Sequence, residues 1–456
     1  MSRLFIATND PEFGVMTDHD RISNGLFRFG GAPSMTTLNL ICQGKDSPRF
    51  KVLNIEDAHY VPIDRLAELP NYFIATNVAS HPNQWTGYID GLEKNLPEND
   101  KPDRLNLFEC IHPECLKDLQ SGKAFLLLDQ THEGYNAPWL WEWFYLSIAK
   151  YKVPPQNIIY ITGDLLSPDL HNAFCNKNLI DNDNRINVMG YSLFEEGVYS
   201  ASVYEWKHEK ITLEENLIYK RENLHDIKVY NCLQKRPRNH RLWLFKELHN
   251  HGILYKGINT MNFIEDSERM NGEVYFHDEK MESYIVDQMN EILPMLPDKK
   301  YENYRNDDLT DFAEICSGKW QMMLNKDILL DSWVSVISEA SASSDQCFCS
   351  EKIFKPIIQE HPFLVWGDRY TMAKMRELGY QTFDNWWSEA YDIQDMRKRL
   401  DYLITTMVEL CNKTSDQWFD IMEDMKPVLK HNSKLIKTKS AEDVRDELKF
   451  IVGKIA

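Results

Sequence analysis

The feature that most constrains the fold is a pair of short, uninterrupted apolar runs separated by a helical pattern. The runs are Ala124-Phe125-Leu126-Leu127-Leu128, which ends at Asp129, and Ile158-Ile159-Tyr160-Ile161, which ends at Thr162-Gly163-Asp164. Such runs predict strands buried on both faces of a parallel sheet. Between them, residues 138–151 have apolar side chains one turn apart and predict a helix that begins at Pro138. Together these segments predict a right-handed βαβ unit.

The same alternation recurs in the second half of the chain. Strands are predicted at 229–233, 333–337 and 362–366, helices at 242–251, 351–360 and 370–378, and further helices across the charged stretch from 262 to 330. We therefore predict an α/β fold with two Rossmann-like domains facing a cleft and a C-terminal helical segment. The predicted limits are 1–225, 226–400 and 401–456, with the last segment packing across both domains.

Charge and composition argue against several classes of protein. The chain has 456 residues and a formal net charge of −19, which repels nucleic acids, although a local basic cleft can coexist with it. No window approaches the roughly 18–20 uncharged apolar residues of a membrane span, and Met1-Ser2-Arg3-Leu4 does not open a signal peptide. We predict no membrane span and a cytoplasmic location, which is the host cytoplasm if the chain is phage-encoded. The nine cysteines show no disulfide framework.

A basic segment follows the predicted strand at 229–233. Its members are Lys235, Arg236, Arg238, His240 and Arg241. Open α/β sheets bind ligands beyond the carboxyl ends of their strands. A helix N-terminus with arginines nearby suits a phosphate, because backbone N–H groups, the helix dipole and guanidinium groups all favour an anion. The segment therefore predicts a phosphate site, and the alternative interpretation is a solvated basic loop.

A second polar cluster opens the predicted helix at 351–360. It combines a serine cap, Ser350, with the acid Glu351 and the bases Lys352 and Lys355. In a nucleotide-sugar site, a carboxylate can accept hydrogen bonds from ribose hydroxyls while a lysine meets the pyrophosphate. The alternative is an ordinary capped helix with a favourable acid in its first turn. Taken alone, these residues favour the cap.

Three segments together resemble the donor-domain core of fucosyltransferase-like GT-B glycosyltransferases. They are Val336-Ile337-Ser338-Glu339-Ala340-Ser341, Ser350-Glu351-Lys352-Ile353-Phe354-Lys355-Pro356-Ile357 and His361-Pro362-Phe363-Leu364-Val365-Trp366-Gly367-Asp368. In that family a phenylalanine-glutamate-asparagine segment precedes a threonine-glutamate-lysine helix, a buried strand and a glycine-containing turn. The basic segment is similar to a loop in related bacterial and phage proteins. The resemblance covers roughly residues 225–400, and Ser338, Ala340 and Ser350 depart from the family pattern.

The resemblance implies inverting transfer of a sugar from a nucleotide-diphosphate sugar to an acceptor hydroxyl, without a bound cofactor or metal. Glu339 and Glu351 would hold the ribose or sugar, and Lys352 with Arg236 or Arg241 would stabilise the departing diphosphate. The partners are the nucleotide sugar and an acceptor, which is a glycan, a lipid-linked sugar, a protein or a modified nucleobase.

Three alternatives to this function remain open. One is a phage-type DNA-modifying glycosyltransferase that acts on a hydroxylated base, and another is a non-catalytic nucleotide- or glycan-binding protein. The third is a phosphotransferase or nucleotidyl enzyme that uses the same basic segment, although no glycine-rich P-loop supports it.

Inverting transfer also requires a general base for the acceptor hydroxyl. The segment Asp129-Gln130-Thr131-His132-Glu133-Gly134-Tyr135 follows a predicted strand of the first domain. We rank Glu133 and Asp129 first as catalytic residues and treat His132 and Asp164 as weaker candidates. In the alternative interpretation these residues only cap the helix near Pro138. The aromatic residues at 139–145 and 386–387 are interpreted as core or interdomain packing, with sugar stacking as the alternative.

Overall fold

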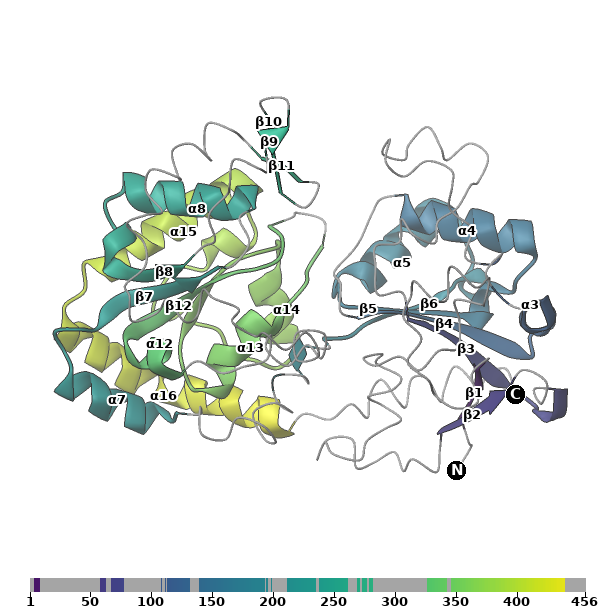
Figure 1. Ribbon diagram of the computed structural model, residues 1–456, viewed down its shortest axis with the longest axis horizontal. Coiled ribbons are helices and arrows are strands. Elements are labelled where there is room, and N and C mark those ends of the chain that lie inside the picture. Colours follow the sequence, from purple (N-terminus) through teal and green to yellow (C-terminus); the bar gives the residue numbers. More distant parts are fainter. Residues whose placement is uncertain are drawn as a thin grey trace. The chain divides into compact units, whose positions relative to one another are not determined.

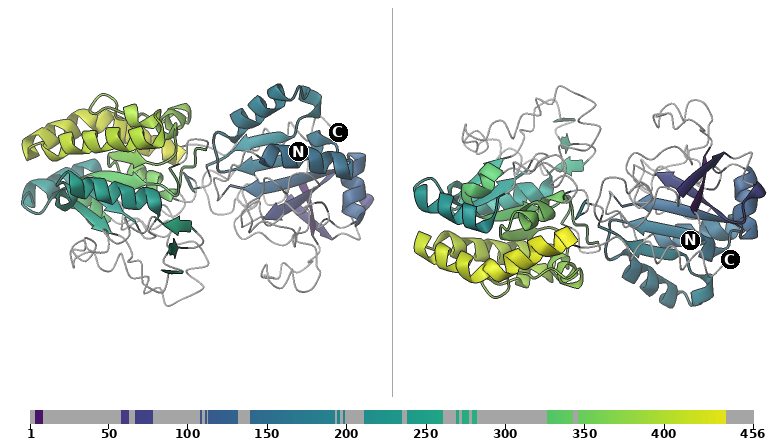
Figure 2. Two further views of the ribbon diagram at one scale, coloured as in Figure 1. Left: turned by 90° about the horizontal axis from the view of Figure 1, so that it is seen from above. Right: turned by 90° about the horizontal axis from the view of Figure 1, so that it is seen from below.

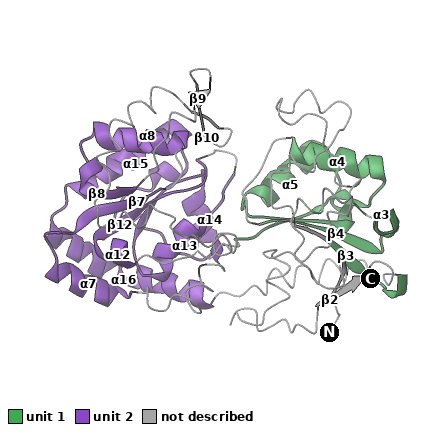
Figure 3. Ribbon diagram, viewed as in Figure 1, with its two compact units in different colours: residues 1–193, 439–456 green, residues 194–438 purple. Residues whose placement is uncertain are grey.

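In the computed structural model, the chain divides into two compact units (Figure 3). Unit 1 comprises Met1–Leu193 and Lys439–Ala456, and unit 2 comprises Phe194–Thr438. The structure describes residues 4–8, 58–62, 67–77, 108, 111, 113–131, 139–192, 194–195, 198, 211–234, 238–260, 269–270, 273–276, 279–281, 326–342 and 346–438. The domain limits at 225 and 400 differ from these bounds and stay predictions, because compactness does not test where a functional domain ends.

The sheet of unit 1 is parallel throughout its described strands. These are β1 (Leu4–Thr8), β2 (Ala58–Pro62), β3 (Tyr72–Asn77), β4 (Ala124–Gln130), β5 (Ile158–Thr162) and β6 (Asn187–Gly190), in the spatial order β2-β1-β3-β4-β5-β6. The predicted strands at 124–128 and 158–161 are β4 and β5, which pair with each other. All five β5 side chains are buried, as a continuous apolar run in a parallel sheet requires.

Helices α4 (Leu140–Tyr151) and α5 (Ser167–Lys177) lie side by side along the sheet of unit 1 (Figure 1). Helix α3 (Pro113–Ser121) precedes β4. The predicted helix at 138–151 is α4, and it ends at Lys152, which adopts a left-handed φ of 54°. Trp141 and Phe144 of α4 contact the ring of Tyr160 in β5, with centroids 5.9 and 5.5 Å apart. The interpretation of Trp141 and Phe144 as core residues is therefore confirmed.

The main sheet of unit 2 is also parallel. Its strands are β7 (Lys228–Leu233), β8 (Gly257–Thr260), β12 (Ser332–Ser338) and β13 (Phe363–Trp366), in the spatial order β13-β12-β7-β8. The predicted strands of this half are confirmed as β7, β12 and β13. Strand β8, which follows β7 in this sheet's chain order, lies on one side of β7. Strand β12, which comes next, lies on the other side. The order of the strands therefore reverses between β7 and β12. Open α/β sheets bind ligands at such a topological switch point, beyond the carboxyl ends of the strands.

The helices of unit 2 cover both faces of this sheet. Figures 1 and 2 show α8 (Asn239–Asn250) and α15 (Met396–Cys411) over one face, and α7 (Leu213–Glu222), α12 (Lys326–Leu330), α13 (Glu351–Ile358) and α16 (Ser415–Thr438) over the other. Helix α14 (Thr371–Glu377) follows β13. Trp333 of β12 stacks on Trp418 of α16, with ring centroids 5.8 Å apart. The helices that follow β7 and β12 therefore lie on opposite faces, as a switch point requires.

The prediction of helices across 262–330 is wrong for the described residues 269–270, 273–276 and 279–281. Strands β9 (Arg269–Met270), β10 (Glu273–Phe276) and β11 (Glu279–Met281) form a small antiparallel sheet in the order β11-β10-β9. The run Val274-Tyr275-Phe276 is β-branched and aromatic, and Asn271-Gly272 before it is a strong sequence signal for a hairpin. The overall charge of the stretch outweighed these local signals in the prediction.

The predicted fold class is confirmed. Each unit is α/β with a parallel sheet, and α15 and α16 supply the helices towards the C-terminal end. Both of these helices belong to unit 2. Their packing across both domains stays a prediction, as does the cleft between the domains.

A buried lysine and a buried histidine lie in the core of unit 2. Lys220 of α7 is 0% exposed, and its Nζ donates to Asn216 Oδ1 and to the carbonyl oxygens of Leu329 and Leu330, at 2.5–2.8 Å. His361 is also 0% exposed, and neither of its ring nitrogens has a hydrogen-bond partner in the described part of the chain. Burial, together with the charge of Lys220, lowers the pKa of His361 well below its usual value. His361 is therefore neutral in the native protein at neutral pH.

The buried histidine predicts a loss of stability in mild acid. Below about pH 6.5 the unfolded chain binds a proton at His361 that the native state does not bind, so the free energy of unfolding falls as the pH falls. We expect His361→Gln to reduce this slope by up to about 1.4 kcal/mol per pH unit. Urea unfolding of both proteins between pH 7 and pH 4.5 measures the two slopes. Equal slopes would show that His361 takes up a proton in the folded protein.

Candidate functional site

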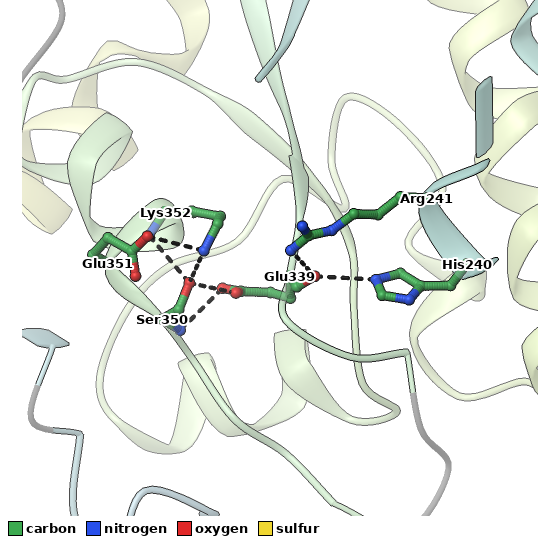
Figure 4. A network of polar contacts seen from close by, with 6 residues as sticks. All are labelled: His240, Arg241, Glu339, Ser350, Glu351 and Lys352. Carbon is green, nitrogen blue, oxygen red and sulfur yellow. Dashed lines mark hydrogen bonds and ion pairs between the residues drawn. The ribbon is translucent and has the colours of Figure 1, made fainter. Parts of the chain in front are cut away.

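The switch point of unit 2 brings together residues that the sequence predicted separately (Figure 4). Around Glu339 at the end of β12 lie His240, Arg241, Ser350, Glu351 and Lys352. The first two come from the start of α8, and the last three from the cap and first turn of α13. Arg238 and Lys355 belong to the same two elements, whereas Arg236 lies outside the described residues.

Glu339 is the centre of this site and is only 1% exposed. Its backbone N–H donates to the carbonyl oxygen of Trp366 at 2.9 Å. Its own carbonyl oxygen accepts hydrogen bonds from Arg241 Nη2 at 2.9 Å and from His240 Nε2 at 3.1 Å. A Cβ at Gly367 would lie 3.1 Å from both Cβ and Cγ of Glu339, so the turn after β13 needs a glycine there. Glu339 therefore joins β12, β13 and α8.

The carboxylate of Glu339 holds the start of α13. Its Oε1 accepts the backbone N–H of Ser350 at 3.0 Å, and its Oε2 accepts the Ser350 hydroxyl at 2.5 Å. Ser350 is also the N-cap of α13, because its Oγ accepts the backbone N–H of Lys352 at 3.3 Å. The same Oγ accepts Lys352 Nζ at 3.1 Å, and Nζ forms an ion pair with Glu351 Oε1 at 2.9 Å. The predicted helix cap at Ser350 is therefore confirmed, and the residues that form it also belong to the polar cluster around Glu339.

The site is locally cationic although the chain is strongly acidic. Arg238, Arg241, Lys352 and Lys355 supply four cations near the carboxylates of Glu339 and Glu351. Burial raises the pKa of Glu339, against the opposing effects of Lys352 and Ser350. Burial also acts to raise the pKa of Glu351, but Lys352 and Lys355 outweigh it and hold that pKa below its usual value. Burial lowers the pKa of Lys355 to about 8 despite the nearby Glu351. This balance of charges favours an anionic ligand.

The basic residues of the predicted phosphate site contact the chain after β12. Arg238 Nη1 donates to the carbonyl oxygen of Ala340 at 2.6 Å, next to the bonds of His240 and Arg241 to Glu339. Burial, with the neighbouring charge of Arg241, lowers the pKa of His240 to about 3, so its neutral ring donates through Nε2. Burial lowers the pKa of Arg241 to about 10, which leaves it charged at neutral pH. A neutral carbonyl does not cancel the charge of a guanidinium, so both arginines still contribute to the local potential.

Two residues that the sequence did not indicate bind described residues on the chain between Glu339 and Ser350. Asp368 accepts the Ser341 hydroxyl at 2.5 Å and the backbone N–H of Phe348 at 3.1 Å. Arg399 of α15 donates to the carbonyl oxygens of Gly367 at 2.7 Å and Ala342 at 2.6 Å. The Gly367-Asp368 turn was part of the resembling segment, although no role was assigned to Asp368. The sequence does not indicate a role for Arg399, because its partners are carbonyl groups 32 and 57 residues away along the chain.

The catalytic candidates of unit 1 are described only in part. Asp129 belongs to β4, where its backbone pairs with β5, and its side chain lies outside the described part of the structure. Glu133 lies outside the described residues altogether. Asp164 is fully buried and accepts the Ser167 hydroxyl at 2.7 Å and the backbone N–H of Leu166 at 3.1 Å. Asp164 therefore shapes the start of α5, while Glu133 and Asp129 stay predictions.

Within the described residues, no group of three or more histidine, cysteine, aspartate or glutamate side chains is arranged to hold a metal ion. None of the described helices combines the length and apolar character that crossing a membrane needs.

Comparison with known proteins finds similarity only at the level of structure. No protein family and no curated protein matches the sequence. Among solved structures, α,α-trehalose 6-phosphate synthase from Burkholderia multivorans has 10% identity and a TM-score of 0.39, with 100% of both chains covered. An E. coli trehalose-6-phosphate protein bound with UDP-2-fluoro glucose has 11% identity and a TM-score of 0.41, covering 98% of this chain and 99% of that one. The N-terminal domain of a Candida albicans trehalose-6-phosphate phosphatase has 9% identity and a TM-score of 0.35, with 95% of each chain covered. Similarity at this level does not carry an argument about activity.

Proposed function

We propose that the chain is a GT-B glycosyltransferase that moves a sugar from a nucleotide-diphosphate sugar to an acceptor hydroxyl. The observation that carries this proposal is that two helix N-termini, those of α8 and α13, meet at Glu339 on the switch point of unit 2. Helix N-termini favour anions, and Lys352 and Arg241 add positive charge at the same place. These features suit the diphosphate of a sugar nucleotide.

The proposed reaction is a single displacement at the anomeric carbon of the sugar. The acceptor oxygen forms the new bond while the bond to the diphosphate oxygen breaks, and the bonding electrons leave with the diphosphate. Fixed cations at the switch point stabilise the developing negative charge without reorganising. A carboxylate of unit 1, Glu133 or Asp129, takes the acceptor proton. Attack opposite the leaving group inverts the anomeric configuration, and side chains perform the charge neutralisation without a metal.

The contacts of the two site carboxylates suggest different roles for them. Both oxygens of Glu339 accept hydrogen bonds from Ser350. Glu351 has a side chain that is 13% exposed and pairs through Oε1 with Lys352. In the proposal, Glu351 accepts hydroxyl groups of the ribose or sugar, and Glu339 supports the site from within the protein.

Binding of a nucleoside diphosphate tests the proposed function directly. In a thermal-shift screen, we expect UDP, GDP or another nucleoside diphosphate at 100 times its dissociation constant to stabilise the protein by about 2.7 kcal/mol. The matching nucleoside, at the same concentration, should stabilise it less because it lacks the phosphates. Calorimetry then gives the dissociation constants, and slow hydrolysis of the matching sugar nucleotide separates an enzyme from a silent binding protein. If no nucleoside diphosphate or nucleotide sugar stabilises the protein, the proposed function is wrong.

A further inference from the structure

We propose that Glu339 is a positioning residue which acts through Ser350 to orient the ammonium group of Lys352 towards a bound diphosphate. The inference rests on the function proposed above and assigns to Glu339 a role other than direct contact with the sugar or ribose. It follows from three linked contacts, those of Glu339 with Ser350, Ser350 with Lys352, and Lys352 with Glu351 (Figure 4).

The direction of each hydrogen bond in this chain follows from the chemistry of its groups. A carboxylate can only accept, so the single proton of the Ser350 hydroxyl points to Glu339 Oε2. The lone pairs of Ser350 Oγ then face Lys352, which donates to them through its backbone N–H and through Nζ. An ammonium group has three N–H donors. Ser350 Oγ and Glu351 Oε1 take two of them, and the geometry assigns the third to a phosphate oxygen.

The rigid surroundings of Glu339 make it suited to this role. Its backbone is held on both sides, by Trp366 through its N–H and by His240 and Arg241 through its carbonyl oxygen. Its side chain passes Gly367, where even a methyl group would lie 3.1 Å from it. In contrast, the Lys352 side chain is 29% exposed and has a long, flexible stem. A rigid carboxylate therefore fixes the hydroxyl, and the hydroxyl restrains a flexible cation.

Two substitutions separate positioning from simple packing. Glu339→Gln keeps the size of the side chain. Its amide oxygen must accept the backbone N–H of Ser350, so its amide nitrogen faces Ser350 Oγ and donates to it. The Ser350 hydroxyl proton must then point towards Lys352, where it repels the N–H donors of the lysine. Ser350→Ala removes the relay and leaves Glu339 bonded to the backbone N–H of residue 350. Ser350→Thr keeps the hydroxyl and serves as the conservative variant. Ser433→Ala is the matched control, because Ser433 is a buried serine in α16 whose hydroxyl donates to the carbonyl oxygen of Ile358.

The readout is the preference of the protein for a nucleoside diphosphate over its nucleoside, measured by calorimetry with UDP and uridine and with GDP and guanosine. We expect Ser350→Ala and Glu339→Gln each to reduce this preference about three- to fivefold, because losing one supporting hydrogen bond costs less than losing the lysine itself. Ser350→Thr and Ser433→Ala should retain it. In a double-mutant cycle, Ser350→Ala should have less than about a twofold further effect when Lys352 is already alanine.

The possible results separate this inference from the function on which it depends. If the wild-type protein binds no nucleoside diphosphate, both fail. If the wild-type protein shows the preference and Lys352→Ala loses it, but Ser350→Ala keeps it, only the relay is wrong. Equal effects of Ser350→Ala with and without Lys352 would also overturn the relay, because a purely structural role of Ser350 acts independently of the lysine. Should Glu339→Gln fail to fold, the Ser350 variants still decide the outcome.

Discussion

Replacing Lys352 by alanine is expected to lower turnover about 100-fold while weakening donor binding only about tenfold, because its charge matters most when the diphosphate leaves. Its ammonium group lies 2.9 Å from Glu351 Oε1 and 3.1 Å from Ser350 Oγ at the start of α13. A fixed cation of this kind stabilises the transition state more than the bound substrate. Donor affinity is measured by calorimetry, and turnover is measured separately with saturating sugar nucleotide.

Glu351→Gln supplies the matched contrast to Lys352→Ala. If Glu351 accepts a ribose or sugar hydroxyl, the amide loses the charge-assisted bond and weakens donor binding by about 1.5–3 kcal/mol. If Glu351 only favours the helix start, the substitution costs about 0.3–1 kcal/mol of stability and leaves donor binding unchanged. Melting temperatures measured in parallel separate a role of Glu351 in donor binding from a role in helix stability. Normal donor binding and normal turnover in both variants would place the site elsewhere in the chain.

Hydrophobic patterning was sufficient to predict the parallel sheets. Strands β4, β5 and β13 contain short apolar runs that are buried in the sheet, and such runs have few other stable positions in a folded domain. The pattern does not determine which strands lie next to each other. The reversal between β7 and β12 depends on pairings across about a hundred residues, such as Ser335 with Asn231, and therefore appears only in the structure. The small sheet at 269–281 was missed because its strands are only two to four residues long.

The candidate site was predicted as a set of residues but not as a set of contacts. Sequence shows that Arg238 and Arg241 follow a strand, but it does not show that they donate to the carbonyl oxygens of Ala340 and Glu339. These bonds join residues 102 and 98 positions apart. The role of Ser350 as a helix cap was predicted from the sequence, whereas its hydrogen bonds to Glu339, 11 positions away, appear only in the structure. Sequence therefore indicated where charge would gather, and the structure shows what each charge contacts.

Replacing Glu133 or Asp129 by alanine is expected to reduce turnover about 100-fold or more, the usual contribution of a general base, while leaving donor affinity nearly unchanged. Both residues are at or just after the end of β4 in unit 1, whereas the cationic site proposed to bind the donor belongs to unit 2. A residue that only removes the acceptor proton does not contact the diphosphate. The measurement is donor affinity by calorimetry beside turnover with an acceptor, for each variant separately.

Asp164→Ala provides the control for this last prediction, because Asp164 follows the neighbouring strand but bonds to Ser167 and Leu166 at the start of α5. Loss of these buried hydrogen bonds typically costs about 1–3 kcal/mol of stability, and we expect it to leave turnover unchanged at temperatures where the variant is folded. A general base also gives turnover an acid limb, since protonation of the carboxylate removes activity at low pH. The variant without the true base should lose that limb along with its rate. Wild-type turnover in both Glu133→Ala and Asp129→Ala would remove the segment after β4 from the mechanism.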